Sequence, residues 1–388
     1  LLIETPKTFS EMARPLALTM QLRAHLCIMT AARQLFTAAQ QKCKRTSLRN
    51  RYWDFKTMDF GYSEEQVLFS NSLQKLLSDS YNVDVRRALV EDGPGYSEDV
   101  WKAFAEMGLL ALPFPEDMGG FDGTSVDTMV VAIELGRHLA LEPYVPTVVM
   151  AGSALKLAGS DAQKTDLIAK IISGDLKMAV ALTEPGSRFD MADVTTRAVA
   201  NGDDYIISGS KSVVLGGDLA DKIIVSVRTS GDTRSEDGLT LFIVDANADG
   251  VSRETYSLLD GRGGADIHLE NVRVPASAVL GTLDQAWSVM EHVADQASAA
   301  LCAESLGAFE KVNELTLEYL KVREQFGRPI GKFQVLQHHM ADMVIEYEHA
   351  RSLVCQSSMK ADSEDAAERG KAVSSTKVYL GEGGHKSC

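Results

Sequence analysis

One decapeptide combines groups that can hydrogen-bond a ligand with an abrupt change of chain direction. Residues 181–190 read ALTEPGSRFD and begin with the last two residues of the apolar run KMAVAL, residues 177–182. This run indicates a buried strand that reaches the surface at a Pro-Gly turn. Thr183 supplies a hydroxyl group, and the main-chain N–H groups of the turn from Pro185 to Phe189 can polarise acceptor atoms. Taken alone, the stretch also matches an ordinary turn in which Pro185 and Gly186 set the backbone.

A second stretch places charge, an aromatic ring and glycines where a helical pattern stops. Residues 323–334 read REQFGRPIGKFQ, and the apolar positions before them recur at helical spacing. Glycine and proline end such a helix. A cation in the last turn, here Arg323, is favoured by the helix dipole.

Several kinds of cofactor site are excluded by what the sequence lacks. No GxGxxG or GxxxxGK[ST] motif occurs, which argues against a Rossmann or P-loop nucleotide site. The five cysteines form no CxxC pair, so free thiols in a reducing compartment are expected. His338 and His339 are adjacent and would point in different directions on a helix, so no metal site is expected.

Charge and hydropathy restrict the partners of the chain. The formal net charge of −15 over 388 residues argues against a nucleic-acid or anionic-membrane binder, because the field of the molecule repels polyanions. No apolar run reaches the roughly 18 residues needed to cross a bilayer. We therefore expect a small-molecule or protein partner, with no nucleic acid and no membrane span.

The first 57 residues differ from the rest in composition. They carry ten Lys or Arg residues and three acids, and residues 12–53 contain no acid. Two interpretations stay open: a transit peptide, or upstream sequence translated in error before a true start at Met58. In both cases residues 1–57 are a leader that is not expected to be part of the fold.

Three segments with different periodicity follow the leader. Residues 58–175 have helical spacing, with Ser63 as a candidate N-cap. Residues 176–284 are short β-branched runs separated by Gly, Asn and Asp, which predict antiparallel strands, and NGDD predicts a hairpin. Helical spacing returns in residues 285–388, with one helix from about Gln334 to Met359 and another from near Asp365.

Four segments, in this order, resemble the acyl-CoA dehydrogenase family of flavoproteins. They are GLLALPFPEDMGG, ALTEPGSRFD, NVRVPASAVLG and YLKVREQFGRPIGKFQVLQHHMADM. The REQFGRPIGKFQ block is the most specific, and the similarity covers about residues 58–388. The resemblance implies an α+β fold with an N-terminal helical domain, a central antiparallel β-barrel domain and a C-terminal four-helix bundle, here cut short.

The resemblance also implies FAD, bound between the β domain and the C-terminal helices. Leu182 and Thr183 are expected to line the flavin, with Thr183 hydrogen-bonded to the ring edge. Gly186, Val213 and Leu215 complete the cofactor-binding residues that the resemblance implies in the β domain.

The C-terminal block carries the remaining implied cofactor contacts. Arg323 matches the family arginine that reaches the FAD pyrophosphate across a subunit interface, where a guanidinium fork suits phosphate oxygens. Phe326 and Gln334 match cofactor contacts in the same block.

The sequence departs from the family at positions that concern the substrate and the flavin. Phe189 stands where a hydroxyl group commonly helps to hold the acyl-CoA, and it is expected to contact the substrate. Val213, Val214 and Leu215 replace an aromatic-x-Thr stretch that commonly follows the conserved lysine, here Lys211. Leu215 donates no hydrogen bond.

The catalytic base stays unassigned. The reaction needs a carboxylate that takes the α-proton while the β-hydrogen leaves as hydride. In the family it lies either beyond an LHGG segment, which this chain lacks, or at the position of Ala297, which Ser298 follows. Asp295 points elsewhere on the helix and is kept as a candidate substrate contact.

We therefore expect FAD-dependent α,β-dehydrogenation of an acyl-CoA thioester, with electrons passed to an electron-transfer flavoprotein or a similar acceptor. A homotetramer, or a heterotetramer with a paralogous subunit, is implied. The alternatives are a non-catalytic subunit of a heteromeric acyl-CoA dehydrogenase and an acyl-CoA oxidase. The departures resemble a divergent bacterial branch that includes the small subunit of pimeloyl-CoA dehydrogenase. A bacterial cytoplasmic location is expected, or the mitochondrial matrix if residues 12–57 are a transit peptide.

Overall fold

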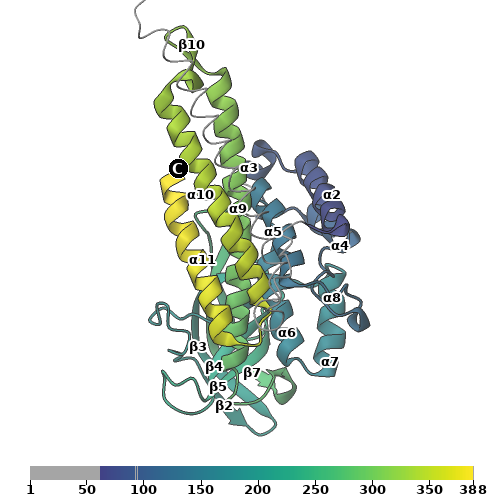
Figure 1. Ribbon diagram of the computed structural model, residues 1–388. Coiled ribbons are helices and arrows are strands. Elements are labelled where there is room, and N and C mark those ends of the chain that lie inside the picture. The colour runs from purple at the N-terminus through teal and green to yellow at the C-terminus, as the bar shows by residue number, and fades with distance from the viewer. Residues whose placement is uncertain (1–61, 92, 94, 388) are drawn as a thin grey trace, which may run out of the picture. The chain divides into compact units, whose positions relative to one another are not determined.

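The computed structural model describes residues 62–387 except 92 and 94, so the prediction for the leader, residues 1–57, lies outside the described residues. Helices come first, strands follow and long helices close the described chain (Figure 1). This order of helical, β and helical parts agrees with the order expected from the periodicity.

The first part consists of short helical segments around an aromatic core. They are α2 (Glu64–Ser80), α3 (Val83–Glu91), α4 (Glu98–Glu106), η1 (Glu116–Met118), α5 (Ser125–His138), η2 (Val145–Ala151), α6 (Gly152–Ala158), α7 (Asp161–Gln163), η3 (Lys164–Ile168) and α8 (Ala169–Ile172). Ser63 caps α2 as predicted, because its hydroxyl accepts from the Gln66 N–H and the Gln66 side chain accepts from the Ser63 N–H. Trp101, Phe104 and Phe114 are buried in the core.

The second part is one eight-stranded sheet. Its strands are β1 (Met178–Ala181), β2 (Arg197–Asn201), β3 (Asp204–Leu215), β4 (Lys222–Arg228), β5 (Leu239–Asp245), β6 (Val251–Ser257), β7 (Gly263–Pro275) and β8 (Val279–Leu280), with η4 (Ala276–Ala278) before β8. The predicted NGDD hairpin is confirmed, because Asn201 pairs with Asp204 across a two-residue loop in which Gly202 has a φ of 67°.

The strand pairing differs from the expected antiparallel barrel. The strands pair in the open order β6-β7-β3-β2-β4-β5-β8, and β6 and β8 end this path in the described part of the chain. β1 pairs with β4 in parallel, from Met178 opposite Lys222 to Ala181 opposite Val225. All four residues of β1 are buried, as expected of a parallel strand that enters a sheet from a helical segment.

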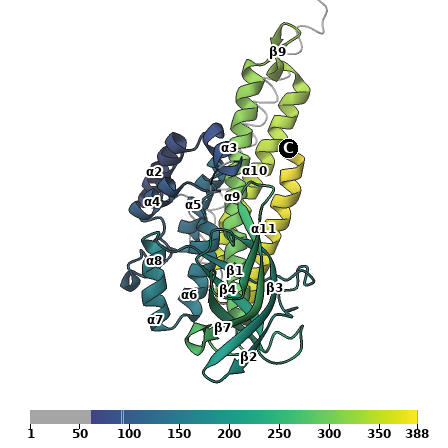
Figure 2. The same cartoon turned by 180° about the vertical axis from the view of Figure 1, so that it is seen from behind.

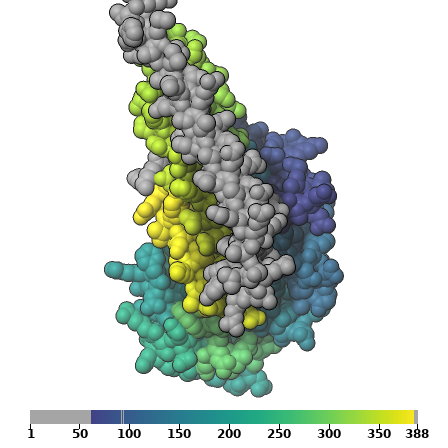
Figure 3. Space-filling model, viewed as in Figure 1, coloured from purple at the N-terminus to yellow at the C-terminus, as the bar shows by residue number. Residues whose placement is uncertain are grey.

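The third part contains three long helices within the described residues, where a four-helix bundle cut short was expected. They are α9 (Trp287–Val322), α10 (Gln334–Ala361) and α11 (Ala366–Ser387), and they run alongside one another in both ribbon views (Figures 1 and 2). In the space-filling view α10 and α11, green to yellow, reach the surface above the teal sheet (Figure 3). The predicted starts at Gln334 and near Asp365 are confirmed.

Two glycines allow α5 and α9 to cross in main-chain contact. A Cβ atom added to Gly136 would stand 1.9 Å from the carbonyl oxygen of Glu304, and one added to Gly307 would stand 1.9 Å from that of Ile133. Any larger residue would push the helices apart. This crossing joins the first helical part to the third.

A Gly307→Ala substitution is expected to destabilise the fold by about 1–3 kcal/mol, because overpacking outweighs the helix propensity of up to ~1 kcal/mol that alanine adds. Gly381→Ala is the matched control, since Gly381 also lies in a helix but has no atom within 4 Å of an added Cβ. The control should gain stability. Urea unfolding of both variants checks this, and a Gly307→Ala midpoint at or above wild type would contradict it.

Candidate functional site

The turn after β1 closes on itself through Ser187. The Glu184 N–H donates to the Ser187 hydroxyl at 3.0 Å, and the Ser187 N–H donates to the Glu184 carbonyl at 3.1 Å. Arg188 has a positive φ of 52°, and Phe189 after it is fully exposed. No atom lies within 4 Å of a Cβ built on Gly186. The turn therefore presents an open surface beside an apolar ring.

The end of β3 is irregular where the flavin contacts were predicted. The pairing of β3 with β7 shifts register between Lys211 and Val214. Val213 has a φ of 54°, which is rare for a β-branched residue, and 62% of its surface is exposed. Its N–H donates to Asp266 Oδ1 at 2.9 Å, and the Tyr256 hydroxyl donates to the same oxygen at 2.7 Å. Asp266 thus holds an apolar side chain outward.

Two hydrogen bonds place these segments side by side. The Thr183 hydroxyl donates to the Ser212 carbonyl at 2.6 Å, and the Ser212 N–H donates to the Thr183 carbonyl at 3.0 Å. The structure therefore brings together five of the predicted cofactor residues on two neighbouring segments. They are Leu182, Thr183, Gly186, Val213 and Leu215. Leu182 is buried, whereas Thr183 and Leu215 are half-buried.

A buried ion pair lies next to this contact. Lys211 Nζ is 2.8 Å from Glu184 Oε1, and the two side chains are 0% and 4% exposed. Burial lowers the pKa of Lys211 to about 8, although Glu184 opposes this shift. Burial alone would raise the pKa of Glu184, but Lys211 and hydrogen bonds from Thr195 and Thr196 outweigh it and lower that pKa to about 2. Both groups are therefore charged at pH 7.

The other three predicted cofactor residues lie on the loop between α9 and α10. This loop holds β9 (Glu324–Gln325), β10 (Arg328–Pro329) and η5 (Ile330–Lys332). Arg323 and Gln334 are exposed, and Phe326, at a φ of 55°, is 90% exposed. The ring of Phe326 meets that of Phe333 edge to face, with centroids 6.1 Å apart.

The chain does not bring its two sets of predicted cofactor residues together. The residue just before α9 lies against the sheet, because the Ala286 N–H donates to the Leu239 carbonyl. The 36 residues of α9 span about 54 Å at ~1.5 Å per residue. Both ribbon views show the β9–β10 loop at the end of α9 away from the sheet (Figures 1 and 2).

The two predicted substrate contacts lie on different elements. Phe189 lies on the turn after β1, whereas Asp295 lies in α9 and is paired with Arg369 of α11 at 2.7 Å. Asp295 and Arg369 are 15% and 4% exposed, so the charge of the carboxylate is compensated within the helices. Ala297, at one of the two positions where the resemblance implies a base, is buried.

A buried carboxylate on α9 was missed by the sequence reasoning. Glu304 Oε2 accepts from Arg262 Nη1 at 2.9 Å, and Arg262 Nε donates to Asp260 at 2.8 Å. Burial raises the pKa of Glu304, while Arg262 opposes this shift. The group borders a cavity of about 300 Å³ together with Lys377. Its only signal in the sequence is an acid inside the apolar run ALCAESLGAF.

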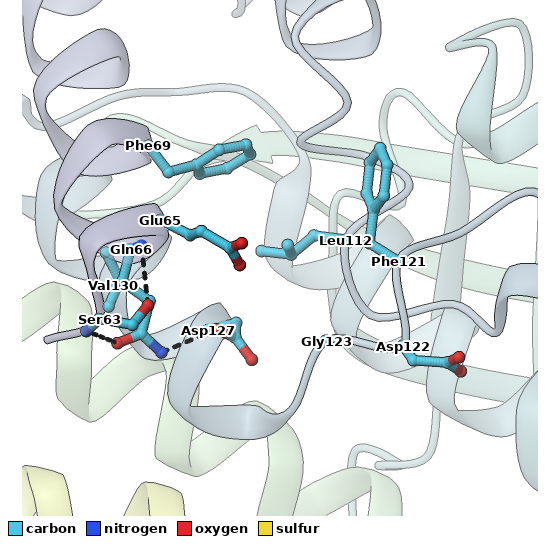
Figure 4. Close-up of a pocket in the computed structure, with 10 residues that line it drawn as sticks. All are labelled: Ser63, Glu65, Gln66, Phe69, Leu112, Phe121, Asp122, Gly123, Asp127 and Val130. Atoms are coloured by element: carbon cyan, nitrogen blue, oxygen red, sulfur yellow. Dashed lines mark hydrogen bonds between the residues drawn. The ribbon is translucent and has the colours of Figure 1, made fainter.

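Another cavity, of about 350 Å³, lies in the first helical part. Glu65 and Phe69 of α2 point toward Leu112, and Phe121 stands beyond it (Figure 4). None of the predicted site residues lines this cavity.

Among the described residues, no group of three or more His, Cys, Asp and Glu side chains is arranged to hold a metal ion. Within the same residues, no helix has both the length and the apolar character that a membrane crossing requires.

Three family models match consecutive parts of the chain. The N-terminal, middle and C-terminal domains of acyl-CoA dehydrogenase match residues 63–175, 179–272 and 284–387. The chain belongs to the acyl-CoA dehydrogenase family. It is therefore an oxidoreductase of the acyl-CoA dehydrogenase type, a class that uses FAD.

Similar proteins cover most of this acyl-CoA dehydrogenase-type chain. The probable acyl-CoA dehydrogenase YngJ of Bacillus subtilis is 30% identical over 267 residues, which are 68% of this chain and 70% of that protein. The caffeyl-CoA reductase-Etf complex subunit CarC of Acetobacterium woodii is 29% identical over 306 residues, 77% and 79% of the two chains.

A solved structure shares the acyl-CoA dehydrogenase fold. The ChsE4-ChsE5 complex from Mycobacterium tuberculosis matches with a TM-score of 0.75 and 25% identity, over 85% of this chain and 86% of that chain. The helical, β and helical parts therefore form one known architecture, although the strands do not close into a barrel.

The residues on the β domain fit the flavin that the acyl-CoA dehydrogenase family implies. Val213 exposes an apolar side chain on a strained backbone, and the space over Gly186 is open. Because the Thr183 hydroxyl donates its hydrogen to Ser212, its oxygen is left to accept a further hydrogen bond. An apolar surface with one acceptor at its edge suits a planar ring that carries polar groups at its rim.

Glu184 should make the fold acid-sensitive. Its pKa is lower in the folded chain than in the unfolded one, so its contribution is present above about pH 4.5 and is lost as the pH falls toward 2. A shift from 4.5 to about 2 corresponds to roughly 3 kcal/mol. The difference in unfolding free energy between wild type and Glu184→Gln should therefore shrink between pH 5 and pH 3.

Urea unfolding at a series of pH values measures this difference. Glu98→Gln is the control, because Glu98 pairs with Lys102 on the exposed surface of α4 and such pairs contribute little. A gap between wild type and Glu184→Gln that stays constant from pH 5 to pH 3 would rule out the assignment.

Proposed function

We propose that this chain takes part in the FAD-dependent α,β-dehydrogenation of an acyl-CoA thioester and contacts flavin through two separate regions. The first region is the pair of segments joined by Thr183 and Ser212, and the second is the β9–β10 loop. The observation that carries the proposal is the contact between Thr183 and Ser212, since it sets an open turn beside exposed Val213 in a chain of this family.

The residues of the first region would bind and shield the cofactor. When bound, FAD accepts the β-hydrogen of the acyl group as hydride. Leu182, Val213 and Leu215 would exclude water from one side of the ring. Thr183 would accept a hydrogen bond from the ring edge, and Phe189 would cover part of the acyl-CoA.

The second region would act on a flavin held by another chain. About 54 Å of helix separates the β9–β10 loop from the sheet, so Arg323, Phe326 and Gln334 are too far away to complete the site of their own chain. A homotetramer, or a heterotetramer with a paralogous subunit, would bring the two regions together. The ChsE4-ChsE5 neighbour is itself a complex of two different chains.

The electrons would pass to an electron-transfer flavoprotein. The similar CarC chain is named as a subunit of a complex with Etf, which supports this acceptor over oxygen. In the oxidase alternative, reduction by an acyl-CoA under air would release peroxide.

A second candidate function is a non-catalytic subunit whose partner supplies the base. Ala297 carries no proton acceptor, and Asp295 is held by Arg369.

We also propose domain limits of 58–175, 176–284 and 285–388. The bacterial cytoplasm is the proposed location, because the YngJ and CarC chains described above come from bacteria. The resemblance to the pimeloyl-CoA dehydrogenase branch stays a prediction.

The flavin spectrum tests the proposed function. The purified full-length chain, alone and with FAD added, should show a bound flavin band near ~450 nm, and anaerobic acyl-CoAs of different lengths should bleach it. Bound flavin that no acyl-CoA bleaches would favour the non-catalytic subunit. A chain that binds no FAD, alone or with the paralogue of its genome, would refute the proposal.

Hybrid assemblies test the division between two chains. Arg323→Ala and Gly186→Trp should each weaken FAD binding in homomers, because one removes a phosphate contact and the other fills the open space over the turn. Mixed and reassembled, the two variants should recover up to about half of the flavin, because one site in each hybrid then has both regions intact. Titration with FAD measures this recovery, and none in a verified hybrid would contradict the model.

A further inference from the structure

The buried pair of Glu184 and Lys211 makes directed hydrogen bonds in addition to balancing its two charges. Lys211 Nζ donates to Glu184 Oε1 at 2.8 Å and to the Ser226 hydroxyl at 3.0 Å. The Ser226 hydroxyl lies 3.4 Å from the carbonyl oxygens of both Ala181 and Leu182. The ammonium group is thus linked through one serine to the last residues before the turn.

The carboxylate of Glu184 holds a second segment. Its Oε2 accepts from the Thr195 N–H at 2.8 Å and from the Thr195 hydroxyl, and its Oε1 accepts from the Thr196 N–H at 3.0 Å. Both amides lie in the chain that leads from the turn into β2. One side chain therefore fixes both ends of the segment that carries the turn, at Glu184 and at Thr195.

The alternation of an extended chain relates this pair to the proposed flavin surface. Adjacent side chains on extended backbone point to opposite sides. Glu184 and Lys211 point into the core, while Thr183 and Ser212, their chain neighbours, are bonded to each other. A movement of either charged side chain would displace the Thr183–Ser212 contact, because one peptide unit joins Glu184 to Thr183 and one joins Lys211 to Ser212.

Packing alone does not account for two charges at this depth. Removing a carboxylate and an ammonium group from water is unfavourable, and apolar residues of similar volume often replace such pairs without loss of stability. Apolar residues would not, however, accept the Thr195 and Thr196 amides in fixed directions. The pair therefore sets the conformation of the turn, which a purely packed core would leave less defined.

We propose that Glu184 and Lys211 are positioning residues that hold the Thr183–Ser212 contact and the turn after β1 in the conformation that receives flavin. The inference rests on the proposed function for the identity of the ligand. The conformational part does not depend on any ligand.

The test compares Lys211→Met with Arg137→Met in the full-length chain. Arg137 joins α5 to α9 through Glu310 at 2.9 Å, and its side chain is 14% exposed, so its loss also destabilises the fold but leaves the turn intact. At temperatures chosen for equal folded fractions, Lys211→Met should weaken FAD binding at least tenfold more than Arg137→Met. Amide exchange in residues 182–187 and 195–196 should rise in Lys211→Met alone.

Ser226→Ala keeps both charges and covers the case in which Lys211→Met does not fold. Ser226→Ala should weaken FAD binding and raise amide exchange, as Lys211→Met does, but by a smaller factor. If Lys211→Met and Ser226→Ala show the same FAD affinity and amide exchange as Arg137→Met at matched stability, the positioning role is overturned. If the wild type binds no FAD, the proposed function fails, and amide exchange in the same segments still decides whether the pair positions the turn.

Discussion

The contact of α5 with α9 at Gly136 and Gly307 is the constraint on which the arrangement of the chain depends. It brings two main chains together, so neither helix can shift along the other without a collision between backbone atoms. The same helix α9 begins against the sheet and ends at the β9–β10 loop. The crossing therefore fixes the first helical part with respect to the helix that reaches both proposed flavin regions.

Buried charge is the second organising factor. Glu184 pairs with Lys211 where almost no surface is exposed, and Glu304 pairs with Arg262 where little is exposed, so in each pair the two charges compensate each other. Each pair includes a residue next to a chain reversal in the β domain. These residues are Glu184, in the turn after β1, and Arg262, just before β7. Chain reversals expose main-chain polar groups, and Glu184, which also accepts from the Thr195 and Thr196 N–H groups, restricts the conformations that its loop adopts.

Local signals explain which parts of the fold were predictable from the sequence. The cap at Ser63, the NGDD hairpin and the end of α9 before its Gly-Pro loop each depend on neighbouring residues, so the sequence shows them directly. The segment order also indicated the family. The parallel pairing of β1 with β4 had no such signal, because it depends on where the first helical part ends in space and β1 begins.

The candidate site was predictable only in part, for the same reason. Motif resemblance indicated the two regions, but the ion pairs join residues 27, 42 and 74 positions apart, which no local pattern reveals. Asp295 illustrates the limit. Its position on a helix was clear from the spacing, whereas its engagement by Arg369 follows from the packing of α11 on α9.

The length of α9 has an evolutionary consequence. If the two proposed flavin regions lie at opposite ends of a ~54 Å helix, a chain can lose one of them while the other remains under selection. After a gene duplication, one copy could then accumulate changes on its sheet while its distal loop, under the proposed function, would still contact the flavin of the other copy. Departures on the sheet beside an unaltered REQFGRPIG loop are the pattern that such divergence would leave.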